Sequence, residues 1–283
     1  MSYINQVLKN LTLQSLIIEI GCGQGELVEH LVINGFNAIG FDPALQLPNH
    51  YLHKSLYDPG HKTNLPVGLF ILRCVLPHIR EPWEYLQALF YQNPDAKILI
   101  EYQRIEFMIK HKLWFNLGHS HVNQFTLQDF KSRFNVLNHG EFSNGEWQWV
   151  LIAINSANPL VLSKDIEFPF RYEIINLVEE KNKFLNRAGS FGPIALFGAA
   201  GKGIVLAEAL IKSGAHLINA IDSSKFRSNK FLEVSGVQVV LPEKAIKLLP
   251  TDTKVLVCNP NHIGEAKNIL RNKFEIILPI DLY

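Results

Sequence analysis

The sequence predicts an α/β protein that consists of two doubly wound units in series. Strand-like and helix-like segments alternate in both halves of the chain, and a glycine cluster follows the first strand of each half. The length of 283 residues exceeds the usual size of one domain. Apolar residues make up 47% of the chain, which is enough for a sizeable core in each unit.

In the first half, apolar runs predict strands and the amphipathic segments between them predict helices. The strands are expected over residues 15–21, 36–43, 67–76 and 96–102. Helices are expected over residues 25–35, closed by Gly35, and over residues 81–93, with Pro82 near the start. This βαβ rhythm indicates a parallel sheet.

The pattern changes after the fourth of these strands. Residues 119–134 are expected to form a loop and then a helix capped by Thr126, with Asp129 three residues later. Residues 134–142 and 146–154 predict an antiparallel pair around the turn "SNGE".

The polar segment 155–170 is expected to link two domains, at residues 1–158 and 159–283. After a helix at 172–189, the alternation of strands and helices starts again. Strands are expected at 194–198, 216–222, 253–260 and 274–280, with a helix at 204–214.

The bulk properties exclude several classes of protein. A net charge of +1 gives no general attraction to nucleic acid or to an anionic membrane. The three cysteines, Cys22, Cys74 and Cys258, form no CxxC pair, so we expect neither a cysteine-built zinc site nor a disulfide framework. No segment reads as a signal peptide or a membrane span, and a cytoplasmic location is expected.

A glycine-rich turn, "GCGQG" at residues 21–25, follows the first predicted strand. Glycine lets the backbone and the helix N-terminus approach a ligand closely. Asp42, at the end of the next strand, is placed to accept hydrogen bonds from ribose hydroxyls. The alternative is a tight turn that binds no ligand.

The segment "IEIGCGQGELVEHL" closely resembles motif I of the class I methyltransferases that use S-adenosylmethionine, and "GFDP" resembles their ribose-binding strand end. Nicotinamide enzymes prefer Gly-x-Gly-x-x-Gly, which holds a pyrophosphate at the helix N-terminus. The resemblance implies S-adenosylmethionine as cofactor and the following cofactor-binding residues: Glu19, Gly21, Gly23, Gly25 and Asp42.

Three histidines are candidates for the chemistry. His78 follows the strand at 67–76, where such folds expose functional residues; the alternative is a solvated histidine at a helix start. His119 and His121 share a face if their segment is extended. They are open to three interpretations: solvated loop residues, a metal pair, or a general base working near neutral pH. No third ligand at a fixed spacing accompanies them, so no metal is expected.

The order "CVLPHI", then His121-x3-Phe-Thr, then "GAAGKG" resembles the sugar C-methyltransferases of deoxysugar biosynthesis, over most of the chain. The sequence departs from that family in several places. The N-terminal zinc module is not represented, Gly118 and Ser120 replace a tyrosine and a glutamate, "NGE" replaces Gly-Gly-Ser, and Cys258 replaces a tryptophan before Asn259.

The resemblance implies methylation of a carbon beside the keto group of a nucleotide-linked sugar. His121 matches the family's base and His78 a second histidine near the keto oxygen, while His119 completes the candidate catalytic set. Because Ser120 cannot replace a glutamate that orients the base, an altered pH profile or acceptor is expected.

The second glycine cluster, "GAAGKG" from Gly198 to Gly203, is not a Walker A loop, since Leu196 and Gly203 stand where that loop needs glycine and Ser or Thr. It predicts a Rossmann-like turn that is either purely structural or meets a phosphate or carboxylate through Lys202. By the resemblance, this domain shapes the acceptor site, with Lys202, Gly198 and Asn259 as substrate-binding residues.

We therefore predict a Rossmann-like class I methyltransferase domain followed by a second Rossmann-like α/β domain. The predicted partner is a small acceptor, foremost a nucleotide-linked keto-deoxysugar, with no nucleic acid and no membrane. The alternatives are an O- or N-methyltransferase of another small molecule and a catalytically silent protein that binds S-adenosylmethionine. Nicotinamide-dependent oxidoreduction ranks last.

Overall fold

The computed structural model describes residues 2–9, 11, 14–117, 121–154 and 170–282. The chain divides into two compact units. Unit 1 comprises Met1–Ile105 and Ser120–Glu167, and unit 2 comprises Glu106–His119 and Phe168–Tyr283. The predicted boundary at residues 158 and 159 and the predicted linker up to residue 169 lie outside the described residues. Glu106–His119 groups with unit 2, although the sequence places this segment inside the first domain.

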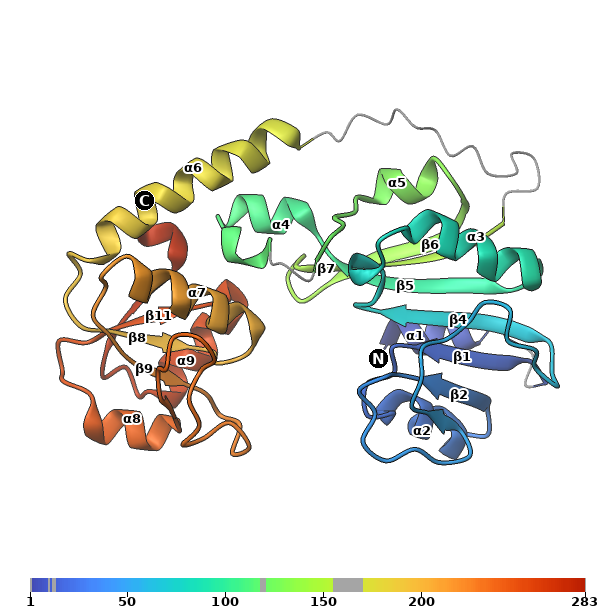
Figure 1. Cartoon of the computed structure of the whole chain (residues 1–283), viewed down its shortest axis with the longest axis horizontal. Helices are drawn as coiled ribbons and strands as arrows, with labels where there is room; N and C mark the ends of the chain where they lie inside the picture. The colour runs from blue at the N-terminus through green and yellow to red at the C-terminus, as the bar shows by residue number, and fades with distance from the viewer. Residues whose placement is uncertain (1, 10, 12–13, 118–120, 155–169, 283) are drawn as a thin grey trace. The chain divides into compact units, whose positions relative to one another are not determined.

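Unit 1 contains a seven-stranded sheet in the order β3-β2-β1-β4-β5-β7-β6, in which only β7 runs against the others (Figure 1). The strands are β1 (Leu16–Ile20), β2 (Asn37–Phe41), β3 (Leu52–His53), β4 (Val67–Arg73), β5 (Lys97–Gln103), β6 (Asn135–Phe142) and β7 (Trp147–Ala153). The predicted strands and the predicted antiparallel pair are confirmed. The two-residue strand β3 was not predicted, because it is too short to show a pattern.

The helices of unit 1 cover both faces of this sheet. They are α1 (Ser2–Leu8), α2 (Glu26–Ile33), η1 (Leu76–His78), α3 (Pro82–Gln92) and α5 (Leu127–Lys131). Alternate residues of each strand point to opposite faces. Ile17, Ile71 and Leu99 pack with α1 and α2, whereas Ile18, Phe70 and Ile100 pack with α3 and α5.

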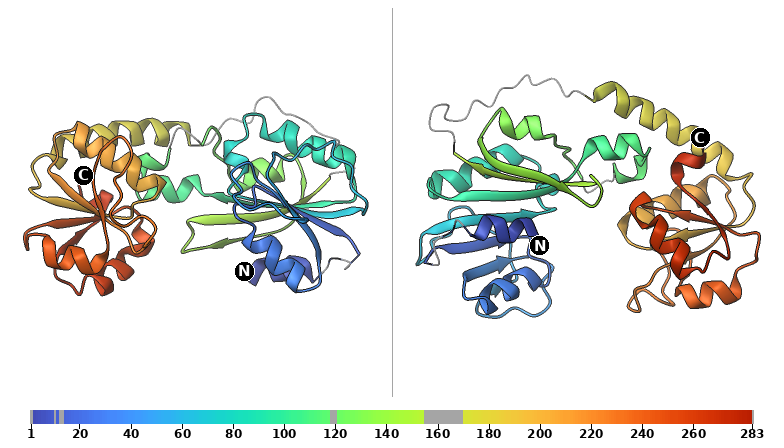
Figure 2. Two further views of the ribbon diagram at one scale, coloured as in Figure 1. Left: turned by 60° about the horizontal axis from the view of Figure 1, so that its bottom comes forward. Right: turned by 180° about the vertical axis from the view of Figure 1, so that it is seen from behind.

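Unit 2 contains a five-stranded parallel sheet in the order β10-β9-β8-β11-β12, with helices on both sides (Figure 2). Its strands are β8 (Ile194–Phe197), β9 (Leu217–Ile221), β10 (Val239–Val240), β11 (Lys254–Val257) and β12 (Glu275–Ile277). With the strands numbered from β8, this is the doubly wound order 3-2-1-4-5, so the predicted second Rossmann-like α/β domain is confirmed.

One face of this second sheet packs on α8 and α9, while α6, α7 and η2 pack on one another. The helical segments are α4 (Ile105–Lys110), η2 (Trp114–Asn116), α6 (Arg171–Ala188), α7 (Gly201–Lys212), α8 (Pro242–Leu248), η3 (Pro260–His262), α9 (Ile263–Ile269) and η4 (Pro279–Leu282). Trp114 of η2 meets Phe184 of α6 edge to face, with ring centroids 5.8 Å apart. This contact helps explain why the segment after β5 belongs to unit 2.

None of the described helices combines the length and the apolar character needed to span a bilayer.

Gly203, in the first turn of α7, provides a test of how this helix packs on its own loop. A Cβ atom at Gly203 would lie 2.0 Å from the carbonyl oxygen of Gly198, whereas a Cβ at Gly201 would meet no atom within 4 Å. We expect Gly203→Ala to lower the free energy of unfolding of unit 2 by about 1–3 kcal/mol, because a backbone atom must move. Gly201→Ala is the matched control and should have little effect. Urea denaturation followed by circular dichroism measures both, and equal stability of the two variants would contradict this packing.

Candidate active site

The candidate site lies where the strand order of unit 1 reverses. From β1 the chain proceeds to β2 on one side, and from β4 it proceeds to β5 on the other. In open α/β sheets a crevice forms outside the carboxyl ends of the two strands at such a switch point. The glycine turn follows β1 and η1 follows β4, so both segments border this crevice.

Two glycines of the turn are required by packing. A Cβ atom at Gly21 would lie 2.2 Å from Cγ2 of Val75, and one at Gly25 would lie 2.4 Å from Cδ1 of Leu52. Gly23 is different: it is exposed and a Cβ there would meet no protein atom within 4 Å. Gly23 is therefore the position at which the turn faces open space.

The N–H groups of the turn are largely engaged inside the protein. The bonds are Gly21 N to Phe41 O (2.8 Å), Cys22 N to Phe41 O (3.2 Å), Gly23 N to an Asp42 carboxylate oxygen (2.9 Å) and Gly25 N to Cys22 O (2.9 Å). Two carboxylates, Glu26 and Glu29, stand in the first turn of α2. Engaged donors and acidic neighbours disfavour a pyrophosphate here and favour a cationic cofactor.

Asp42 connects the glycine turn to the end of β2. Its Oδ2 accepts the hydrogen bond from Gly23 N, and its Oδ1 accepts one from Ala44 N at 2.7 Å. It forms no ion pair with the described residues. Since a carboxylate can accept about four hydrogen bonds, Asp42 retains capacity for two hydroxyl donors.

A charged cluster occupies the α1 side of the sheet at the same edge. Arg73 Nη1 lies 3.4 Å from Oε1 of Glu19, and Arg73 Nε lies 3.4 Å from Oε1 of Glu101. The hydroxyl of Tyr3 donates a hydrogen bond to Glu101. The three charged residues come from the adjacent strands β1, β4 and β5, with Arg73 directly opposite Glu101. One guanidinium thus contacts two carboxyl groups.

Both glutamates of this cluster are almost completely buried, at 2% exposure for Glu19 and 4% for Glu101. Burial raises the pKa of Glu19 to about 7; Arg73 opposes this shift and Asp42 adds to it. Burial likewise raises the pKa of Glu101 to about 7. Oε2 of Glu19 is buried without a hydrogen-bond partner, which leaves an acceptor beside the glycine turn for a ligand cation.

The structure brings two of the three candidate catalytic histidines together. The rings of His78 in η1 and His121 lie 4.7 Å apart between centroids, at an interplanar angle of 69°. Asn123 secures this arrangement, because its N–H donates to Pro77 O (3.2 Å) and its side-chain amide donates to Ile79 O (2.6 Å). His119 lies outside the described residues. In the described parts of the chain, no three His, Cys, Asp or Glu side chains converge as metal ligands.

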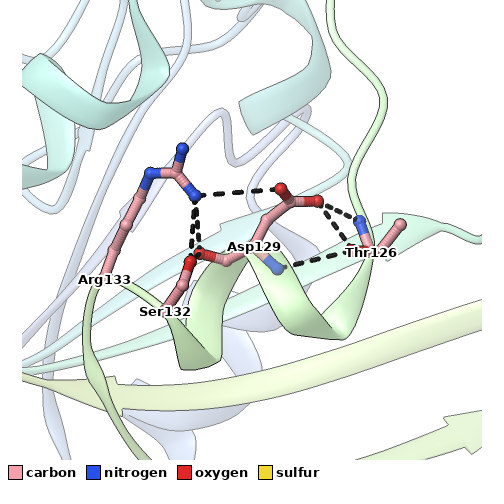
Figure 3. A network of polar contacts seen from close by, with 4 residues as sticks. All are labelled: Thr126, Asp129, Ser132 and Arg133. Atoms are coloured by element: carbon pink, nitrogen blue, oxygen red, sulfur yellow. Dashed lines mark hydrogen bonds and ion pairs between the residues drawn. The ribbon is translucent and has the colours of Figure 1, made fainter. Parts of the chain in front are cut away.

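The predicted helix cap at Thr126 is confirmed and fixes the segment that carries His121. The Thr126 hydroxyl accepts from Asp129 N, and the Asp129 carboxylate accepts from Thr126 N at 2.8 Å, which completes a capping box (Figure 3). Arg133 Nη1 contacts Asp129 and Ser132 behind it (Figure 3). Five residues after His121, the chain is therefore held firmly.

The second glycine cluster repeats the backbone arrangement of the first with different charges. Ala199 N and Ser224 N donate to the Asp222 carboxylate at 3.0 and 2.8 Å, as Gly23 N and Ala44 N do to Asp42. Here, however, Arg227 Nη1 lies 3.2 Å from both carboxylate oxygens. The acceptor capacity of Asp222 is thereby filled, so the second turn is not equipped to hold a ribose diol as the first is.

The candidate substrate-binding residues of unit 2 lie at the carboxyl edge of its sheet. Gly198 follows β8, and its carbonyl receives a contact from the Cys258 thiol at 3.6 Å. Asn259 follows β11, and its side chain caps η3 by accepting from Asn261 N. Lys202 stands in the first turn of α7 and is partly buried. Burial raises the pKa of Cys258 to about 12, so this thiol stays protonated.

The strand order of unit 1, with its single reversed strand, and the glycine turn followed by Asp42 define a class I methyltransferase domain, the class whose cofactor is S-adenosylmethionine. Residues 2–138 match the family model described as "Methyltransferase domain". The protein is therefore an enzyme that uses S-adenosylmethionine as its methyl donor. The matched residues fall in unit 1 apart from the segment that belongs to unit 2.

Several solved structures resemble the chain over about half its length. They include S-adenosylmethionine-dependent methyltransferases from Clostridium acetobutylicum (12% identity, 54% of this chain and 89% of that chain, TM-score 0.40), Anabaena variabilis (13%, 54% and 83%, 0.39) and Archaeoglobus fulgidus (12%, 53% and 91%, 0.39). At these identities and TM-scores the similarities add no argument of their own. No curated protein matches the sequence.

Sequence reasoning did not find Arg73, Glu101 or Tyr3. A signal was present for the two charged strand residues, because each stands in an otherwise apolar run, "VGLFILR" and "KILIEY". A charged residue inside a buried strand requires a partner. The sequence alone does not show that the partners are each other and Glu19.

The raised pKa of Glu101 predicts how stability depends on pH. Because burial raises this pKa from 4.5 to about 7, the folded state binds the proton more tightly than the unfolded state. The contribution of Glu101 to stability is therefore greatest at low pH and declines as pH rises from about 4.5 to about 7. Glu101→Gln keeps an acceptor for Tyr3 and cannot ionise, so its stability relative to the wild type should rise over this range by up to about 3 kcal/mol.

Urea denaturation at several pH values between about 5 and 8 measures this difference. Glu29→Gln, at an exposed position of α2, is the control and should show no such trend. A difference between Glu101→Gln and the wild type that is constant over this pH range would contradict the buried, raised-pKa carboxyl.

Proposed function

We propose that this methyltransferase methylates a carbon atom beside the keto group of a nucleotide-linked deoxysugar, with His121 as general base. The observation that supports this most directly is the His78–His121 pair at the carboxyl edge of the sheet. Val75, three residues before His78, packs on Gly21 of the glycine turn. The proposed base and the proposed cofactor turn thus border one crevice.

In this proposal, the cofactor is held by residues on both sides of the glycine turn. Glu19 accepts a hydrogen bond from the cofactor ammonium through Oε2, the oxygen that has no partner in the protein. Asp42 accepts from the ribose hydroxyls, and Gly23 lets the cofactor approach the turn. Gly21 and Gly25 act indirectly, by allowing the turn to pack against Val75 and Leu52.

S-adenosylmethionine, when bound, supplies a methyl group that is already activated by its sulfonium sulfur. His121 accepts the proton from the carbon beside the keto group, and the electrons of that C–H bond form the new bond to the methyl carbon. The electron pair of the broken carbon–sulfur bond stays on sulfur. His78 donates a hydrogen bond to the keto oxygen, where negative charge develops. A base paired with a hydrogen-bond donor suits this reaction better than methyl transfer to oxygen or nitrogen, in which no charge develops on a keto oxygen.

The substrate-binding role of Lys202, Gly198 and Asn259 is also part of the proposal. Lys202 brings a positive charge to the N-terminal turn of α7, and Arg227 lies beside the end of β9 with 44% of its side chain exposed. Cations and a helix N-terminus suit the diphosphate of a nucleotide-linked sugar. The filled Asp222 carboxylate argues against a second adenosyl cofactor in this unit.

The cofactor-binding role of Asp42 can be tested against its counterpart in unit 2. Asp42→Asn should weaken S-adenosylmethionine binding by about tenfold to a hundredfold, because a charged acceptor of hydroxyl hydrogen bonds is lost. Asp222→Asn makes the same chemical change in the same backbone arrangement and should leave the affinity unchanged. Isothermal titration calorimetry measures both. Unchanged affinity in Asp42→Asn, or equal losses in the two variants, would overturn the assignment.

The general base can be tested by turnover. His121→Ala should reduce turnover of a nucleotide-linked 4-keto-deoxysugar by about 10²–10⁴-fold and leave cofactor affinity intact, because the imidazole acts on the acceptor. His139→Ala, at an exposed position of β6, is the control. Product formation followed by mass spectrometry provides the readout. Retained turnover in His121→Ala would remove this residue as the base, and methyl transfer to oxygen or nitrogen would replace the acceptor proposed here.

A further inference from the structure

Arg73 is a charged residue in the proposed cofactor crevice, beside Glu19. It is the last residue of β4, the strand next to β1 at the switch point, and its side chain is 39% exposed. Its guanidinium touches Glu19, the residue to which we assign the cofactor ammonium. Arg73 is therefore one contact away from the proposed methionine end of S-adenosylmethionine.

The guanidinium of Arg73 is held loosely by its two protein partners. Both contacts, to Glu19 and to Glu101, are 3.4 Å long, at the far end of hydrogen-bonding range. The Nε atom is buried and has no hydrogen-bond partner. Arginine carries five N–H donors in a planar fork that matches a carboxylate. Nε is buried and Nη1 contacts Glu19, whereas no contact with the described residues engages Nη2, so this nitrogen of the partly exposed side chain is left for a further acceptor.

The charges of the crevice also indicate what this acceptor is. Two carboxylates and one guanidinium leave one negative charge when both glutamates are ionised. S-adenosylmethionine carries an ammonium, a sulfonium and a carboxylate, and its net charge of +1 offsets the excess negative charge of this cluster. Its ammonium and carboxylate stand on the same carbon atom, so a cation close to the residue that binds the ammonium can reach the carboxylate.

We propose that Arg73 binds the carboxylate at the methionine end of S-adenosylmethionine, next to the ammonium bound by Glu19. This inference rests on the cofactor placement proposed above. It makes Arg73 a specificity-determining residue, because it distinguishes the cofactor from adenosyl sulfonium compounds that lack the carboxylate. Glu101, which contacts the guanidinium, and Tyr3, which donates a hydrogen bond to Glu101, then act as positioning residues.

The test compares two ligands that differ only in the carboxylate: S-adenosylmethionine and its decarboxylated analogue. The wild type should bind S-adenosylmethionine more tightly. Arg73→Gln should lower that affinity by about tenfold to a hundredfold and leave the affinity for the decarboxylated analogue nearly unchanged. Lys97→Gln, which removes one positive charge at the opposite end of the same sheet, is the matched control and should not alter the ratio of the two affinities. Isothermal titration calorimetry provides the six affinities, two ligands for each of the three proteins.

A purely structural role for Arg73 would give a different result. Arg73→Gln leaves two buried carboxylates without a cation, which destabilises the fold, so the double variant Arg73→Gln/Glu101→Gln is measured as well. If Arg73 serves only to neutralise Glu101, the double variant should recover both stability and the preference for S-adenosylmethionine, which would overturn the proposal. A double variant that recovers stability but does not recover the preference for S-adenosylmethionine over the decarboxylated analogue supports the role of Arg73 in binding the carboxylate.

The wild type separates this inference from the assignment on which it rests. Equal binding of the two ligands by the wild type would overturn the role of Arg73 and leave the cofactor site in place. A wild type that binds neither ligand would overturn the cofactor site, and the role of Arg73 with it.

Discussion

The hydrogen bond from Gly23 N to Asp42 ties the turn after β1 to the end of β2, and the rest of the site depends on this connection. The turn can take this path because Gly21 and Gly25 allow Val75 and Leu52 to pack directly on the backbone. Those contacts place the start of η1, and hence His78, beside the turn. A larger side chain at either glycine would separate the two edges of the crevice that the proposed chemistry requires.

The two units share one backbone arrangement, but the charges around it differ. In each, a strand-end aspartate accepts one N–H from the glycine turn and one from its own loop. In unit 1, the buried Glu19 precedes the turn and the exposed Glu26 and Glu29 follow it, which suits a cofactor with ammonium and sulfonium groups. In unit 2, Arg227 neutralises the aspartate and Lys202 stands at the helix start, which suits an anion. The backbone alone therefore does not decide which ligand such a turn binds.

Most of the fold could be read from the sequence, because buried parallel strands appear as short apolar runs and the helices between them are amphipathic. The exceptions have specific causes. The strands β3 and β10 have only two residues each, too few to show a period. The assignment of Trp114 to unit 2 depends on its contact with Phe184, seventy positions away, which no local pattern records.

The sequence by itself determined the features that local chemistry dictates: the glycine turn, the aspartate after the second strand and the capping box at Thr126. Each depends on residues a few positions apart or on the end of a recognisable strand. Only the tertiary structure decided that His78 meets His121, that Arg73 lies between Glu19 and Glu101, and that Asp222 is neutralised by Arg227. The first two pairings join different strands or loops, so they depend on strand order and register, and the third depends on how a loop folds back on its own strand end. These are the contacts that set the charge of the site.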